Sequence, residues 1–210
     1  SETVTLNVDE NIIIVKPTED LTICEEDYTE ITFEFIAHAN GAPLTFQWIK
    51  DGNPINDDGV NYDMEVSAPQ GTNGEYTGTL TILDIAEEDS GVYAVEIDGP
   101  EYFTCPQATS KNFTFRVNPI PDNPETTDLT FCLNDTASNL SVDNPDSDYE
   151  YSWYSYDSSA DEFTYIGDNY TPSTSSPGTT TYYVTQKLVE TGCESGMEPL
   201  VVTVLDKPEP

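Results

Sequence analysis

The sequence predicts an all-β chain of two tandem β-sandwich modules, and three observations lead to this prediction. The chain has 210 residues, enough for one or two domains. Its short runs of alternating apolar residues, such as 80–83, are typical of half-buried strands, and its 15 prolines fit frequent turns. A strand followed by a proline-bearing connector occurs at 112–124 and again at 200–210, as expected where a module ends.

The first module is predicted at residues 11–118, and a corner between two of its strands identifies its fold. Asp89 begins a turn that leads into a strand at 92–97, and Tyr93 stands at the start of that strand. A tyrosine placed there can return its hydroxyl to the preceding backbone, which is the tyrosine corner of immunoglobulin-like sandwiches. Trp48 fits the tryptophan at the centre of such sandwiches. We therefore predict an immunoglobulin-like β-sandwich with Trp48, Asp89 and Tyr93 as fold-defining residues.

The other strands of the first module follow from the same alternation. They are expected at 12–15, 21–24, 31–39, 44–48, 80–83 and 112–117, with 21–24 as a short edge strand. Residues 1–10 are interpreted either as the tail of a preceding module or as an added first strand. Residues 119–124 contain several prolines and are predicted to form an extended, semi-rigid linker.

The second module is predicted at residues 125–210, again as an immunoglobulin-like sandwich. Trp153 takes the place that Trp48 has in the first module and is its fold-defining residue. Strands are expected at 129–132, 140–142, 149–153, 179–185 and 200–205, and a turn followed by a strand is expected at 167–170.

The charge of the chain narrows the range of its partners. The sequence has 40 acidic and 6 basic residues, a net charge of −34, and both halves are acidic. Such a surface repels nucleic acid and anionic lipid, and it suits a protein that is bathed in salt or divalent cations. No apolar run approaches the roughly 20 residues of a spanning helix. We therefore predict no nucleic-acid partner and no insertion into a membrane.

Four cysteines in an acidic, sandwich-like chain indicate two disulfides and an oxidising compartment. Three pairings are possible. The usual core positions, near Ala37 and at Val95, hold no cysteine. Cys24 on the early edge strand and Cys105 just before the last strand are expected side by side at one edge of the first sandwich. A bridge there would close a loop of about 80 residues and contribute roughly 4–4.5 kcal/mol.

Motifs in both modules resemble the immunoglobulin-like repeats of large secreted surface proteins of Bacteroidetes. In the first module they are I-x-V-x-P-T-E-D-L-T-I-C-E at 13–25, L-T-F-Q-W at 44–48, T-L-T-I at 79–82 and F-T-C-P at 103–106. In the second they are Cys132, Y-S-W-Y at 151–154, T-T-T-Y-Y-V-T at 179–185 and G-C-E-S at 192–195. The resemblance implies a Cys132–Cys193 disulfide, one disulfide per module, an extracellular or cell-surface location, and an association with type IX secretion and gliding-motility adhesins.

The sequence gives little sign of chemistry. A serine or cysteine nucleophile needs a base, and the single histidine, His38, lies on a predicted strand. Calcium is the best candidate cofactor, because Asp143, Asn144, Asp146 and Asp148 supply oxygen-bearing side chains within one short loop. The loop lacks EF-hand spacing, and the alternative is an exposed loop without metal. We expect no catalysis and no other cofactor.

Outward-facing aromatic residues offer a second kind of site. If the aromatic residues alternating along 149–153 face the core, then Tyr154 and Tyr156 face outward. Exposed rings beside carboxylates can stack on sugar rings, so both are candidate ligand-binding residues. The alternative is that they only cover the outer face of a small sandwich.

The predicted function is that of a non-catalytic structural or adhesive repeat segment of a long secreted cell-surface adhesin. Its expected partners are neighbouring repeat modules of the same chain, together with surface glycans or other cell-surface proteins. The alternative is an accessory glycan-binding or spacer module of an extracellular polysaccharide-degrading enzyme.

Overall fold

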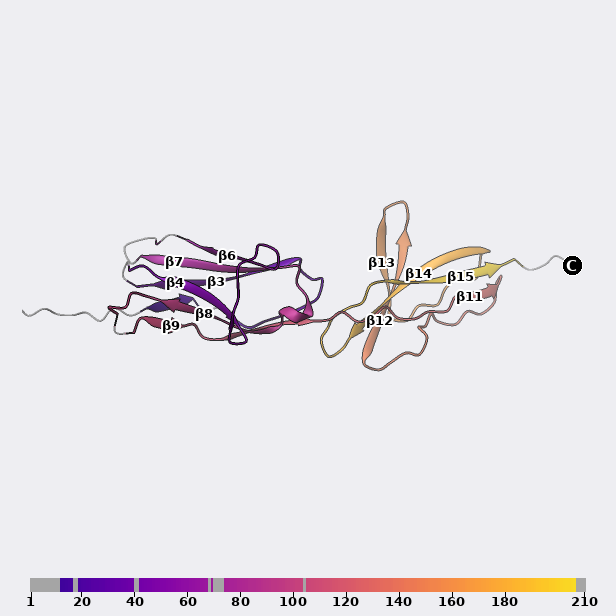
Figure 1. Cartoon of the computed structure of the whole chain (residues 1–210). Coiled ribbons are helices and arrows are strands. Elements are labelled where there is room, and N and C mark those ends of the chain that lie inside the picture. Colours follow the sequence, from indigo (N-terminus) through magenta and orange to yellow (C-terminus); the bar gives the residue numbers. More distant parts are fainter. Residues whose placement is uncertain are drawn as a thin grey trace, which may run out of the picture. The chain divides into compact units, whose positions relative to one another are not determined.

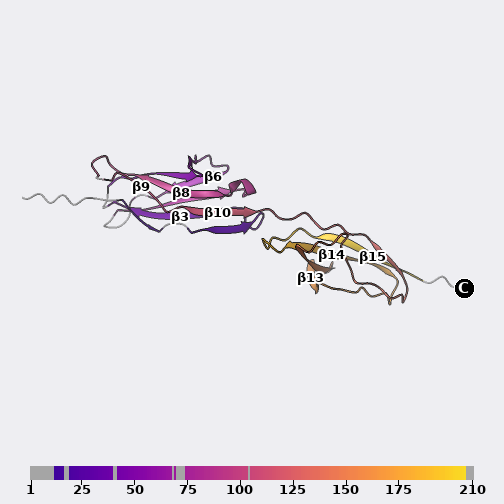
Figure 2. The same ribbon diagram turned by 90° about the horizontal axis from the view of Figure 1, so that it is seen from below.

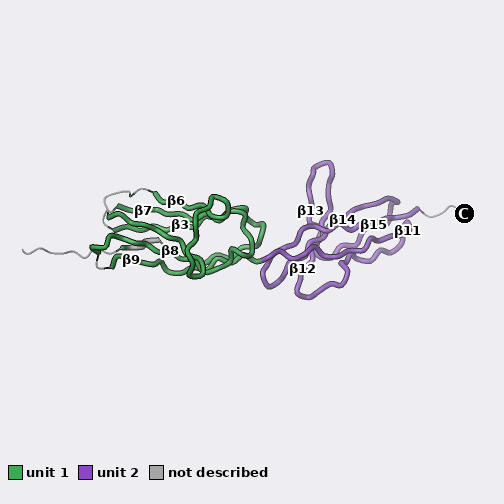
Figure 3. The backbone as a smooth tube through the Cα atoms, in the orientation of Figure 1, with its two compact units in different colours: residues 1–118 green, residues 119–210 purple. Residues whose placement is uncertain are grey.

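The computed structural model describes residues 12–16, 19–39, 42–67, 69, 74–103 and 105–206. The interpretation of residues 1–10 lies outside this part of the chain. The described residues form strands and a single short 3-10 turn, which confirms the all-β fold class. The chain divides into two compact units, the first ending at Asn118 and the second beginning at Pro119 (Figure 3).

Unit 1 contains two sheets that enclose one core (Figure 1). Across the first sheet, the strands are β1 (Ile13–Lys16), β3 (Glu30–His38), β7 (Glu75–Leu83) and β6 (Tyr62–Val66). Across the second, they are β2 (Leu21–Cys24), β10 (Phe113–Asn118), β8 (Gly91–Asp98), β4 (Thr45–Lys50) and β5 (Asn53–Pro54), and β9 (Gln107–Thr109) also pairs with β8. As predicted, β2 is an edge strand, and it runs parallel to β10.

Aromatic rings fill the core of unit 1. The ring centre of Phe35 lies 5.0 Å from that of Phe46 and 5.6 Å from that of Trp48. Trp48 is buried, as predicted for the central tryptophan, and Phe113 meets it edge-on. Gly78 makes room for this packing, because a Cβ atom there would lie 2.2 Å from the Phe35 ring. The two sheets are therefore held together by closely fitted rings, each pair contributing beyond its buried area.

The predicted tyrosine corner is present. Tyr93 Oη donates a hydrogen bond to the carbonyl oxygen of Asp89 over 2.6 Å. Asp89 ends the 3-10 turn η1 (Glu87–Asp89), and its carboxylate accepts hydrogen bonds from the backbone N–H of Ala86 and the hydroxyl of Tyr62. Burial raises the pKa of Tyr93, so this phenol remains a donor and fixes the turn that precedes β8.

The described residues of unit 2 form one five-stranded sheet, in which β14 and β15 lie side by side (Figure 2). One face of this sheet carries the core, where Trp153 and Val184 are paired across β12 and β14 and are fully buried. Across the sheet, the strands are β11 (Leu129–Cys132), β15 (Glu198–Leu205), β14 (Gly178–Leu188), β12 (Tyr149–Asp157) and β13 (Glu162–Gly167).

Segments without strands cover the core face of the unit 2 sheet. Leu140 and Val142 are buried in the core cluster but lie in the connection between β11 and β12. The predicted strand at 140–142 is therefore wrong, although its apolar residues do reach the core. The strand predicted after the turn at 167–170 is also wrong, because β13 ends at Gly167 and the next strand, β14, begins only at Gly178. Alternating apolar residues indicate that one side of a segment is buried. An irregular segment can bury one side in this way without pairing with a strand.

The predicted disulfide of unit 1 is wrong. Cys105 has a free, exposed thiol, whereas Cys24 is disulfide-bonded. Cys24 stands opposite Asn118 at the end of β10, while Cys105 lies in the connection beyond the other end of β8. At about 3.3 Å per residue, these positions lie roughly 30 Å apart along the sheet. A disulfide needs Cα atoms within about 7 Å of each other, so this pair cannot form one.

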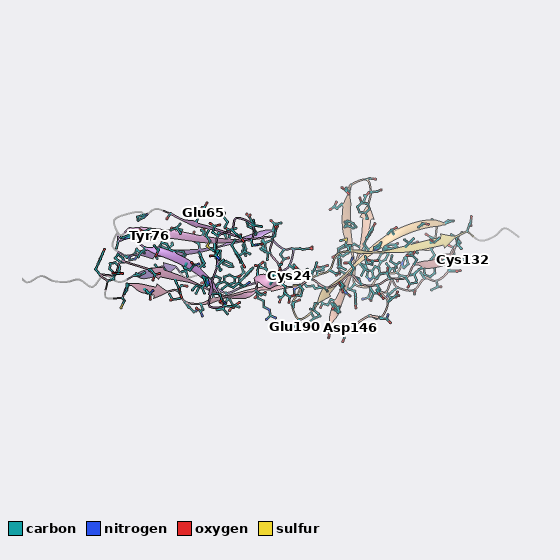
Figure 4. The ribbon with its side chains drawn as sticks, in the orientation of Figure 1. Cys24, Glu65, Tyr76, Cys132, Asp146 and Glu190 are labelled. Atoms are coloured by element: carbon teal, nitrogen blue, oxygen red, sulfur yellow. The ribbon has the colours of Figure 1, made fainter. Side chains whose placement is uncertain are left out.

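The disulfide implied for unit 2 is wrong for the same reason. Cys132 has a free, exposed thiol and stands opposite Leu205 at the end of β15. Cys193 is buried and disulfide-bonded, and it lies in the connection that precedes β15. The length of β15, roughly 23 Å at 3.3 Å per residue, separates them. Figure 4 labels Cys132 at the end of unit 2 from which the chain leaves β15.

Candidate functional site

Five aromatic side chains gather on the outer face of the unit 2 sheet, over β12, β13 and β14. Their strand positions are neighbours, because Tyr154 pairs in register with both Tyr165 and Tyr183, and Tyr156 pairs with Phe163. We call this set the aromatic face, and its members are Tyr154, Tyr156, Phe163, Tyr165 and Tyr183.

Alternation along the strands explains why these rings lie outside. Trp153 and Tyr182 are buried, and the residue that follows each of them points to the opposite face of the sheet. On the edge strand β13, Phe163 is 43% exposed and Tyr165 is 54% exposed. The β12–β13 hairpin that carries them extends away from the rest of the sheet (Figure 1).

The rings of the aromatic face contact one another at steep angles. The ring centre of Phe163 lies 4.8 Å from that of Tyr156 and 5.0 Å from that of Tyr183, and the planes meet at 41° and 87°. The Tyr154 and Tyr165 rings lie 5.7 Å apart at 64°. Such edge-to-face packing is favourable for aromatic pairs. The face therefore presents both ring edges and ring faces rather than one flat platform.

Carboxylates lie at the edge of the aromatic face and accept hydrogen bonds from two of its phenols. Tyr156 Oη donates to Asp161 Oδ1 over 2.6 Å, and Tyr165 Oη donates to Asp168 Oδ1 over the same distance. These hydrogen bonds raise the pKa of both tyrosines, because losing the phenol proton would place two negative charges side by side. The phenols are therefore neutral at physiological pH, and each of them donates its proton to a carboxylate hydrogen bond at the edge of the face.

This arrangement suits two chemical classes of ligand. Ring faces attract cations, more strongly where carboxylates stand nearby, and Lys and Arg side chains supply such cations. Ring faces also stack on the apolar faces of neutral sugars. Anionic ligands are disfavoured by the net charge of −34.

The sequence predicted only part of the aromatic face. Tyr154 and Tyr156 lie outside as expected, because the alternation in β12 could be counted from Trp153. Phe163, Tyr165 and Tyr183 were missed. The signal for β13 was the spacing of Phe163 and Tyr165 two residues apart, and without a prediction of β13 nothing placed these rings beside β12.

The residues of the predicted calcium site have local partners. Asp143 Oδ2 accepts a hydrogen bond from Thr127 Oγ1 over 2.7 Å, and Asp146 Oδ1 accepts one from the Asp148 N–H over 3.0 Å. Asn144 has a left-handed backbone with φ of 51°. Within the described ranges, no group of three or more His, Cys, Asp or Glu side chains is arranged to hold a metal ion. Calcium binding in this loop stays a prediction.

Unit 1 has an open depression of about 430 Å³ beside β4 and β5. Its charged side chains serve the fold. Lys50 Nζ donates to the carbonyl oxygen of Glu88 and lies 5.8 Å from the centre of the Tyr93 ring. Asp58 accepts hydrogen bonds from the backbone N–H groups of Val60, Asn61 and Tyr62, which lower its pKa. The aromatic face is therefore the stronger candidate site.

Comparison with protein families supports the fold of unit 2. Residues 121–205 match the model of a family described as "Ig-like domain CHU_C associated". This match supports an immunoglobulin-like repeat of the Bacteroidetes type, which suggests a structural or adhesive module, and it indicates no enzyme family. No curated protein matches the chain.

Solved structures show distant similarity. Rst D1-D2 is 17% identical with a TM-score of 0.47, over 94% of this chain and 100% of that chain. Duf (Kirre) D1 is 18% identical with a TM-score of 0.41, over 53% of this chain and 100% of that one. Zebrafish RET cadherin-like domains 1 to 4 are 12% identical with a TM-score of 0.41, over 93% of this chain and 51% of that one.

The described residues contain no helix with the length and hydrophobicity that crossing a membrane requires.

Proposed function

We propose that this chain is a non-catalytic structural and adhesive repeat segment of a long secreted cell-surface protein, and that the aromatic face of unit 2 is its contact surface. The aromatic face is the observation that carries the proposal. Large exposed aromatic patches mark interaction sites, and tyrosine is among the residues that contribute most to binding at interfaces. In unit 2 these rings lie on the face of the sheet opposite the core, where their placement suits a partner.

Charge favours a basic protein as the partner. Asp161 and Asp168 bring negative charge to the edge of the face, and both lie in a chain with a net charge of −34. Lysine and arginine side chains of another cell-surface protein could lie over the rings and approach these carboxylates. The steep angles between the rings fit side chains that enter between them.

An extracellular location is part of the proposal. The disulfide-bonded state of Cys24 and Cys193 supports it, because disulfides persist in oxidising compartments. The resemblance to Bacteroidetes repeats extends the proposal to gliding-motility adhesins exported by type IX secretion.

A glycan-binding accessory module of an extracellular polysaccharide-degrading enzyme is the second candidate. The exposed rings of Tyr156 and Tyr165, each beside a carboxylate, favour it. Neutral sugars would stack on the rings, and their hydroxyl groups would donate hydrogen bonds to the carboxylates.

One binding experiment separates the two candidates. The immobilised chain is probed with neutral glycans, with Lys- and Arg-rich peptides and with acidic peptides, at low and high salt. We expect binding of the basic peptides that weakens with salt and is lost in the double variant Tyr156→Ala, Tyr165→Ala. Tyr102→Ala is the matched control, because Tyr102 is 75% exposed and lies in unit 1. Salt-independent binding of neutral glycans, lost in the same variant, would replace the adhesive proposal with the glycan-binding one.

A further inference from the structure

The two units carry equivalent cysteines at the end of their first parallel strand, which we call the early cysteines. Cys24 lies on β2, which runs parallel to the last strand β10, and Cys132 lies on β11, which runs parallel to the last strand β15. The Cys24 N–H donates to Asp27 Oδ2 over 2.9 Å, and the Cys132 N–H donates to Asp135 Oδ2 over 3.0 Å. Both early cysteines therefore lie in the same local backbone arrangement.

The units also carry equivalent cysteines in the connection that follows β8 in unit 1 and β14 in unit 2, which we call the late cysteines. Cys105 lies between β8 and the short strand β9, which itself precedes β10, and Cys193 lies between β14 and β15. β8 and β14 are equivalent, because each pairs with the last strand of its unit on one side and with a tryptophan-bearing strand on the other.

Early and late cysteines of one unit cannot join to each other. They lie at opposite ends of the sheet, separated by roughly 23–30 Å at 3.3 Å per residue, whereas a disulfide spans about 7 Å between Cα atoms. Any disulfide of an early or a late cysteine must therefore use a cysteine from outside its own unit.

Each kind of cysteine has one bonded and one free member. One early cysteine, Cys24, and one late cysteine, Cys193, are disulfide-bonded. One early cysteine, Cys132, and one late cysteine, Cys105, are free and exposed. The bonded state of Cys24 shows that the backbone arrangement around an early cysteine supports a disulfide, and Cys132 stands in that same arrangement.

We propose that Cys132 and Cys105 are linking sites, at which an early cysteine of one module forms a disulfide with a late cysteine of another module of the same kind. For this chain, the linkage joins Cys132 of one copy to Cys105 of a second copy. The reaction is thiol–disulfide exchange with a small disulfide such as oxidised glutathione. The two protein thiols are oxidised to one disulfide, and oxidised glutathione is reduced to two glutathione thiols, which take up the two protons.

Such a linkage would join consecutive modules covalently and independently of the aromatic face. A structural repeat segment held in this way would transmit tension through disulfides as well as through its backbone. A negative result for the cysteine linkage would therefore leave the proposed role of the aromatic face untouched, and the reverse also holds.

Complementary variants test the linkage. Cys132→Ser leaves only the late thiol free, and Cys105→Ser leaves only the early one. Each full-length variant, and their equimolar mixture, is oxidised with glutathione disulfide at about 1 mM protein, the order of effective concentration that a short linker provides. Non-reducing electrophoresis and mass spectrometry of the linked peptides give the readout. Thiol titration and melting curves check that each variant is folded with one free thiol.

We expect each single variant to remain monomeric and the mixture to form a heterodimer bridged between Cys132 and Cys105. The unsubstituted chain should form a ladder of linked copies. Homodimers of either variant as abundant as the heterodimer would overturn the proposal, since the thiols would then be reacting as indiscriminate surface groups. A mixture that stays monomeric while both thiols remain titratable would also overturn it.

Discussion

Unit 1 packs a cluster of aromatic rings between its two sheets, whereas unit 2 carries five aromatic rings on the outer face of its sheet. In unit 1 both layers are built from strands, and rings such as Phe35 and Trp48 meet across the gap. In unit 2 irregular segments form the covering layer, and aliphatic residues such as Leu140 and Val142 complete the core around Trp153. Aromatic rings thus fill the space between two sheets in unit 1, whereas in unit 2 a second group of them lies outside the core and remains available for contact.

The largest expected effect comes from truncating one ring in each unit. Phe35→Ala removes a fully buried ring that packs on Phe46 and Trp48, and it should lower the free energy of unfolding of unit 1 by about 3–5 kcal/mol. Phe163→Ala removes a ring that is 43% exposed and should cost unit 2 about 1 kcal/mol or less. Calorimetry on the full chain measures both. Equal losses would contradict the division of roles between the units.

Removing single hydroxyl groups gives a smaller contrast of the same kind. Tyr93→Phe leaves the Asp89 carbonyl oxygen without its buried donor and should destabilise unit 1 by about 1–3 kcal/mol. Tyr156→Phe removes a hydrogen bond to Asp161 at the surface, where water replaces the donor, and should change stability by less than about 0.5 kcal/mol. Denaturant unfolding of both variants checks this, and a large loss in Tyr156→Phe would assign that phenol to the fold.

The contrast also explains which features the sequence could predict. Tyr93 and Trp48 belong to local motifs whose spacing has one structural meaning, so the corner and the central tryptophan were predictable. The partners of Cys24 and Cys132 depend on the parallel pairing of β2 with β10 and of β11 with β15. That pairing places each early cysteine at the end of its sheet opposite the late one, and alternation carries no information about strand direction.

The sequence could not predict the full extent of the aromatic face, for a related reason. A ring on an edge strand joins its neighbours only through the register of two strands, here Tyr156 with Phe163 and Tyr154 with Tyr165. Counting alternation along β12 gives the side on which Tyr154 lies. It cannot give the strand that pairs beside it.

Alkaline titration distinguishes a buried phenol from phenols of the aromatic face. Burial raises the pKa of Tyr182 from its ordinary value of 10 to about 12. The folded state therefore retains this proton longer than the unfolded state. Stability from Tyr182 is fully present below pH 10 and is lost as the pH rises toward 12. Melting curves of unit 2 across this range should show the loss, and Tyr182→Phe should flatten it.

A phenol of the aromatic face should instead respond to its carboxylate. The hydrogen bond to Asp161 is the main cause of the raised pKa of Tyr156. Asp161→Asn removes the negative charge and should move that pKa back toward its ordinary value, as followed by tyrosinate absorbance. An unchanged titration in this variant would show that the carboxylate does not hold the Tyr156 proton in solution.

The smallest expected effect concerns calcium and the loop at 143–148. Because Asp143 and Asp146 already accept hydrogen bonds within unit 2, we expect calcium, magnesium and sodium chloride at matched ionic strength to raise the melting temperature equally and modestly. Screening of repulsion within a chain of net charge −34 is sufficient cause for such a rise. A rise with calcium alone at low millimolar concentration, abolished by Asp146→Asn, would instead establish a site in this loop. Unit 2 would then be the calcium-stiffened member of the pair, and its aromatic face would stand on a scaffold that calcium makes rigid.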